Sequence, residues 1–81
     1  MTTEERYTLI RTLLKRVAPE SDPDILKPDD PIQSTLGMDS YDFLQFIIAV
    51  CEATGVTIPE EDYGKIGTTR ELEGYLRTIR D

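Results

Sequence analysis

Residues 36–55 read LGMDSYDFLQFIIAVCEATG and predict the central helix of the fold. The apolar residues of this stretch form two rows at helical spacing. The first row contains Phe43, Phe46, Ile47 and Val50, and the second contains Tyr41, Leu44, Ile48 and Cys51. Asp39 or Ser40 can cap the first turn, and Gly55 suits the left-handed position after the last turn. We therefore expect a helix over residues 39–54.

The two apolar rows point in different directions around this helix. We assign the first row to the core, so the second row is at least partly exposed and can form a docking face for another protein. The alternative is a helix that is buried on both sides within a small bundle.

Helices are also predicted on either side of this stretch. Apolar residues recur at spacings of three and four over residues 3–17, where Thr2 and Glu5 can form a capping box, and Pro19 ends the pattern. A second capping box, Thr68 with Glu71, precedes a last helix. The apolar row of that helix contains Leu72, Tyr75, Leu76 and Ile79.

The connections between these helices differ in length. Residues 18–38 hold four of the five prolines and predict a long loop. Four aliphatic residues are the expected anchors of this loop to the core: Ile25, Leu26, Ile32 and Leu36. The alternative is a disordered linker. After a short extended piece at 56–58, Pro59 favours the start of a short third helix, which Gly64 and Gly67 limit in length.

These elements predict an all-α fold, a small four-helix bundle of three main helices plus one short helix, with the long loop between helices one and two. We expect a single domain over residues 1–81, since the chain has only 81 residues and room for one small core. The sequence contains no internal repeat.

The charge and composition exclude several classes of function. The net charge is −7, and the negative excess lies between residues 20 and 62, which argues against binding nucleic acid and favours basic protein partners. The absence of histidine argues against a free-standing enzyme and a histidine-ligated metal. The acidic loop has no EF-hand pattern, so we expect no metal site. One cysteine, no apolar leader and no membrane-spanning segment predict a soluble, cytoplasmic monomer.

The segment around Ser40 resembles the attachment motif of acyl carrier proteins. In that family a Leu-Gly-x-Asp-Ser-Leu run leads into the second helix, and Leu36, Gly37, Asp39 and Ser40 match it position for position. The later segment GVTIPEEDYGKIGTTRELEGYL resembles the family's Gly-x-x-Ile-Pro turn, short acidic helix, Thr-Thr cap and final helix. The resemblance covers essentially the whole chain.

The resemblance implies a carrier and not an enzyme, with no catalytic residue of its own. A separate phosphopantetheinyl transferase would move 4′-phosphopantetheine from coenzyme A to Ser40, and Asp39 would cap the helix and contact the transferase. The thiol of the arm would then carry acyl or related groups as thioesters to acyl-loading and acyl-processing enzymes with basic or apolar docking patches. Asp39 favours an acyl cargo, because peptidyl carriers usually have histidine there.

The resemblance also assigns two groups of residues. The docking face would comprise Tyr41, Asp42, Leu44, Gln45, Ile48, Cys51 and Glu52. An acyl pocket between the helices would be lined by Leu13, Phe46, Ile47, Val50, Ile58, Ile66 and Leu76. Tyr41 replaces the usual leucine, and this helix has fewer glutamates than in fatty-acid carriers, which favours a specialised partner. Two alternatives remain: an unmodified adaptor that only binds proteins, and an aminoacyl carrier.

Overall fold

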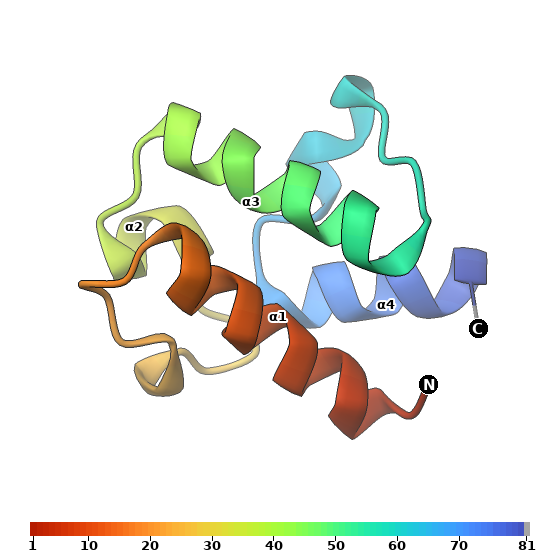
Figure 1. Ribbon diagram of the computed structural model, residues 1–81, viewed down its shortest axis with the longest axis horizontal. Coiled ribbons are helices and arrows are strands. Elements are labelled where there is room, and N and C mark those ends of the chain that lie inside the picture. Colours follow the sequence, from red (N-terminus) through yellow and green to blue (C-terminus); the bar gives the residue numbers. More distant parts are fainter. Residues whose placement is uncertain (81) are drawn as a thin grey trace.

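The fold is all-α in the computed structural model, which describes residues 1–80 (Figure 1). Its three main helices are α1 (Thr3–Val17), α3 (Ser40–Thr54) and α4 (Thr69–Arg80). The shorter elements are the 3₁₀ helix η1 (Pro23–Ile25), the one-turn helix α2 (Ile32–Leu36) and the 3₁₀ helix η2 (Glu60–Lys65). Within the described part of the chain there is no strand, only an isolated bridge between Pro31 and Thr68. The predicted fold class is therefore confirmed.

The boundaries of α1 and α4 follow from local hydrogen bonds that the sequence predicted. The hydroxyl of Thr2 accepts from the Glu5 amide at 3.1 Å, and the Glu5 carboxylate accepts from the Thr2 amide at 2.7 Å. Thr68 and Glu71 form the same reciprocal pair at the start of α4. Each such cap satisfies backbone groups that the helix leaves unpaired and is worth about 1 kcal/mol.

The core lies where α1 packs against both α3 and α4 (Figure 1). The first apolar row of α3 is buried, as predicted, and Phe46 is completely inaccessible. Burial of one such side chain contributes roughly 1.5–3 kcal/mol. The core residues are Ile10, Leu13, Leu14, Ile32, Met38, Phe43, Phe46, Ile47, Val50, Val56, Ile58, Ile66, Leu72 and Leu76. Ile79 was predicted to face the core but is exposed, since the last turn of α4 extends beyond these residues.

The segment between α1 and α3 contains more helix than predicted. It was expected to be a loop, but it forms η1 and α2. Of its predicted anchors, Ile32 is fully buried, and Leu26 and Leu36 are half-buried against the core. Ile25 is 57% exposed, so that prediction is wrong. The tight 3₁₀ turn instead buries Pro23, and Asp22 caps this turn by accepting from the Asp24 amide.

Backbone hydrogen bonds attach this segment to the start of α4. The Ile32 amide donates to the Gly67 carbonyl at 2.9 Å, and the Arg70 amide donates to the Pro28 carbonyl at 3.0 Å. Asp29 also pairs with the Arg70 side chain at 3.3 Å on the surface. The alternative of a disordered linker is therefore wrong, because buried aliphatic side chains and backbone hydrogen bonds both attach this segment to the rest of the fold.

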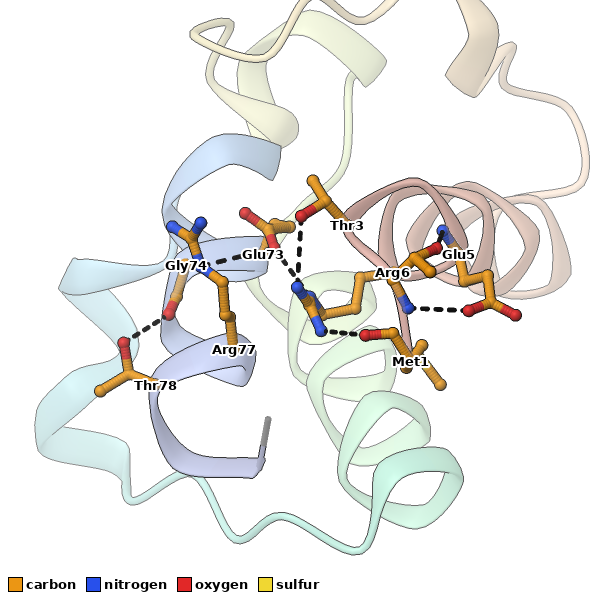
Figure 2. Close-up of polar contacts among 9 residues, drawn as sticks. Met1, Thr3, Glu5, Arg6, Glu73, Gly74, Arg77 and Thr78 are labelled. Carbon is orange, nitrogen blue, oxygen red and sulfur yellow. Dashed lines mark hydrogen bonds and ion pairs between the residues drawn. The ribbon is translucent and has the colours of Figure 1, made fainter.

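A buried ion pair joins α1 to α4 (Figure 2). The Nε of Arg6 donates to Oε2 of Glu73 at 2.7 Å, and the two side chains are 6% and 4% exposed. The remaining guanidinium nitrogens of Arg6 donate to the Met1 carbonyl at 2.7 Å and to the Thr3 hydroxyl at 3.3 Å. Arg77 lies 3.8 Å from the same Glu73 oxygen, at the protein surface. This network orients the N-terminal turn of α1 against α4.

Candidate functional site

Ser40 is the first residue of α3, and its side chain is exposed. The chain reverses just before it at Gly37, whose φ of 67° lies in the left-handed region that glycine adopts without strain. Met38 then inserts into the core and fixes the position of the turn. Asp39 caps α3 by accepting from the Asp42 amide at 2.8 Å.

The N-terminus of α3 suits a phosphate ester on Ser40. The amides of Ser40 and Tyr41 belong to the first turn of a 15-residue helix and have no helical acceptor. The positive end of the helix dipole and these N–H groups favour an added negative charge at this place. A group bonded to the Ser40 oxygen would project into solvent without displacing a core residue.

A cavity of about 460 Å³ opens beside Ser40. Its walls come from three elements that are separate in the sequence: α2, the first turns of α3, and η2. Its lining residues are Gln33, Ser40, Phe43, Leu44, Glu60, Tyr63 and Gly64. Sequence reasoning placed Phe43 in the core and Leu44 on the docking face, and it missed Gln33, Glu60, Tyr63 and Gly64. The spacing of Ser40, Phe43 and Leu44 on one helix face could have suggested the part of this wall that α3 contributes.

The residues predicted for the acyl pocket lie together, but in the closed core. Each of the seven is at most 5% exposed: Leu13, Phe46, Ile47, Val50, Ile58, Ile66 and Leu76. None of them lines the cavity beside Ser40 within the described residues. Their side chains pack against one another in the single core cluster, so a chain between them would have to displace core contacts.

The second row of α3 faces outward, as the one-sided assignment predicted. Tyr41 is 67% exposed, Ile48 43% and Leu44 38%. The alternative of a helix buried on both sides is therefore wrong. Cys51, at the end of the row, is a free cysteine that is half-buried against the core. The polar residues assigned to the same face, Asp42, Gln45 and Glu52, are half-buried or exposed.

A polar contact joins η2 to α4. The Tyr75 hydroxyl of α4 donates to the Asp62 carboxylate at 2.7 Å, and Lys65 pairs with the same carboxylate at 3.2 Å. The hydrogen bond to the charged acceptor, together with partial burial, raises the pKa of Tyr75 to about 12. The same hydrogen bond is the main reason that the pKa of Asp62 is lowered, with a further contribution from Lys65.

The described part of the chain has neither a metal-binding cluster nor a membrane-spanning helix. Over residues 1–80, no group of three or more acidic or cysteine side chains is placed to hold a metal ion. Among the helices of the same residues, none has the length and apolar character needed to cross a bilayer.

Known proteins resemble this chain over about two thirds or more of its length. The family model described as "Phosphopantetheine attachment site" matches residues 8–76, a range that contains α3 with Ser40 at its start. The acyl carrier protein of Syntrophobacter fumaroxidans is 36% identical over 55 residues, which cover 68% of this chain and 68% of that protein.

Other relatives give the same result. The acyl carrier protein of Bdellovibrio bacteriovorus is 34% identical over 55 residues, covering 68% of this chain and 70% of that protein. The acyl carrier protein of Zymomonas mobilis is 33% identical over 55 residues, which also cover 68% of this chain and 70% of that protein. The chain therefore belongs to the acyl carrier protein family, whose members are not enzymes but carriers that bear a 4′-phosphopantetheine group and are modified by a phosphopantetheinyl transferase.

Proposed function

We propose that Ser40 is the residue to which the transferase attaches 4′-phosphopantetheine from coenzyme A. The observation that carries this proposal is the exposed Ser40 hydroxyl at the start of α3, inside the matched family segment. Asp39 holds the first turn of α3 in place and lies where a transferase that reaches Ser40 would contact it. When bound, the group supplies a thiol that carries acyl groups as thioesters.

The protein then presents its cargo to separate acyl-loading and acyl-processing enzymes, in fatty acid, polyketide or a specialised lipid or secondary-metabolite pathway. We propose that it acts in the cytoplasm as a monomer, as one carrier domain over residues 1–81. Its chemistry is carriage, because the bond-making groups belong to the arm and to the partners.

We propose that partners dock on the outward row of α3. Three apolar side chains, Tyr41, Leu44 and Ile48, follow Ser40 along one exposed face. Asp42 and Glu52 add negative charge, and Gln45 and Cys51 complete the surface. A partner with an apolar patch rimmed by basic residues matches this face, with the apolar part giving affinity and the charges guiding the approach.

The cavity beside Ser40 is the place where a tethered acyl group would leave the solvent. It adjoins the attachment residue and has the aromatic side chains of Phe43 and Tyr63 in its wall. A longer chain would extend from there toward the seven core residues assigned to the acyl pocket. Identical chemical shifts of those core residues in the unmodified and acylated protein would contradict this extension.

Intact mass spectrometry tests the proposed attachment. The protein is incubated with coenzyme A, Mg²⁺ and a broad-specificity transferase, and we expect a gain of one phosphopantetheine group. Ser40→Ala should abolish the gain, whereas Ser34→Ala, which removes an exposed serine of α2, should not.

A wild-type protein that gains no mass with several transferases would favour the unmodified adaptor. A captured thioester of an amino acid, instead of an acyl group, would favour the aminoacyl carrier.

A further inference from the structure

The wall that η2 contributes to the cavity beside Ser40 is weakly packed. None of the side chains of η2 is buried, although the residues at either side of it, Ile58 and Ile66, are. A second, open depression of about 510 Å³ is lined by Asp62 and Lys65 of η2 together with residues of α4. The segment is therefore anchored at its ends and has open space on both of its faces.

Two side chains hold the middle of η2 in place. Tyr63 is half-buried and packs against the core. Asp62 lies on the α4 side and accepts a hydrogen bond from the Tyr75 hydroxyl at 2.7 Å, in the wall of the second depression. This bond joins η2 to α4 through two residues 13 positions apart, whereas the pair of Asp62 with Lys65 lies within η2 itself. We call the Tyr75–Asp62 hydrogen bond the tether.

The tether is a charge-assisted hydrogen bond at neutral pH. The pKa of Tyr75 is raised to about 12 and that of Asp62 is lowered, so the donor is protonated and the acceptor is charged over a wide range around neutrality. Elements with few buried contacts open locally at low cost, and a single strong bond then makes a large difference to how often they open.

We propose that Tyr75 and Asp62 are positioning residues that hold η2 as the wall of the cavity beside Ser40 and so determine how well a tethered acyl group is shielded from water. The proposal rests on the proposed function, in which Ser40 bears the cargo. Without the tether, η2 swings away from α3 between Ile58 and Ile66 while the core stays folded.

The first half of this proposal is that the tether holds η2 in place. Amide hydrogen exchange of the unmodified protein tests it. The Asp62 amide donates to the Pro59 carbonyl and the Ile66 amide to the Tyr63 carbonyl, so these bonds close the two ends of η2 and report on its opening. Tyr75→Phe keeps the ring and removes the donor, and should speed exchange of these two amides roughly tenfold. In both proteins the core amides of α1 and α3 should stay more protected than these two, because the opening of η2 leaves the core folded.

Further variants distinguish the loss of the tether from the loss of a tyrosine hydroxyl in general. Tyr7→Phe removes a hydroxyl from α1 that has no hydrogen bond within residues 1–80 and should leave exchange in η2 unchanged. Asp62→Asn keeps an acceptor oxygen and should retain part of the protection. In an Asp62→Ala background, Tyr75→Phe should change exchange less than about twofold, because the two residues act through one bond.

The second half of the proposal is that η2 shields the tethered acyl group from water. It is tested with protein that carries an acyl group. An octanoyl group is attached through the transferase from octanoyl-coenzyme A, and hydroxylamine is used to cleave the thioester. Release should be faster in Tyr75→Phe, by up to roughly the tenfold expected for the amides, because attack on the shielded thioester needs the same opening.

Each measurement has a result that overturns the proposal. Equal amide exchange in wild type and Tyr75→Phe would show that the tether does not hold η2. Faster exchange with equal thioester release would show that η2 does not shield the cargo. Failure of the mass gain at Ser40 would instead overturn the proposed function, while the exchange experiment would still decide the role of the tether.

Discussion

Replacing Arg6 with methionine should destabilise the protein strongly. Methionine keeps a long apolar side chain but removes the guanidinium that pairs with Glu73 at 2.7 Å. Because Glu73 is only 4% exposed, its carboxylate would remain buried without its main partner. The Met1 carbonyl and Thr3 hydroxyl would also lose their donors.

The size of the effect follows from this geometry. Breaking a buried ion pair by removing one partner costs about 3–5 kcal/mol. Arg77, 3.8 Å from the same Glu73 oxygen and 55% exposed, can recover up to ~1 kcal/mol of this. We therefore expect a loss of about 2–4 kcal/mol. An 81-residue protein has a free energy of unfolding of roughly 4–12 kcal/mol, so the loss is a large fraction of the total.

Urea unfolding followed by far-ultraviolet circular dichroism measures this loss as a lower midpoint at unchanged slope. Arg11→Met is the matched control, because Arg11 is 41% exposed and 3.8 Å from Asp24, and it should cost less than about 0.5 kcal/mol. The double variant Arg6→Met with Glu73→Met should recover most of the stability, since no charge stays buried. A loss below ~1 kcal/mol, or a double variant no more stable than Arg6→Met, would refute the argument.

Three further predictions concern the turn, the helix α3 and the tether. Gly37→Ala should lower the free energy of unfolding by about 1–2 kcal/mol in urea titrations, because φ there is 67°; an unchanged midpoint would exclude strain at this turn. Phe46→Ala, at a fully buried position, should cost about 3–5 kcal/mol, whereas Tyr41→Ala should cost less than ~0.5 kcal/mol while weakening partner binding; similar losses for both would contradict the assignment of the two rows. The pKa of Tyr75, about 12 when folded, exceeds the ordinary 10, so the stabilisation by the tether is complete from neutral pH up to about pH 10 and is lost as the pH rises toward 12; a difference titration of tyrosinate absorbance between wild type and Tyr75→Phe that centres near pH 10 would disprove this.

The sequence by itself determined the features that depend on neighbouring residues. The capping boxes at Thr2 and Thr68 placed the starts of α1 and α4, since a cap joins groups only three residues apart. The spacing of apolar residues placed α3 and the position of Ser40 at its start. The attachment motif is equally local, so the family resemblance could be seen before any fold was known.

The tertiary structure decided what depends on elements packing together. Only packing showed that η1 turns Ile25 outward and Pro23 inward, and that Tyr41, Leu44 and Ile48 of α3 stay exposed. The cavity beside Ser40 takes its walls from three elements, and the pair of Arg6 with Glu73 joins residues 67 positions apart. Periodicity and caps report bonds within one helical turn, whereas these contacts depend on how whole elements are placed in space, which no local pattern contains.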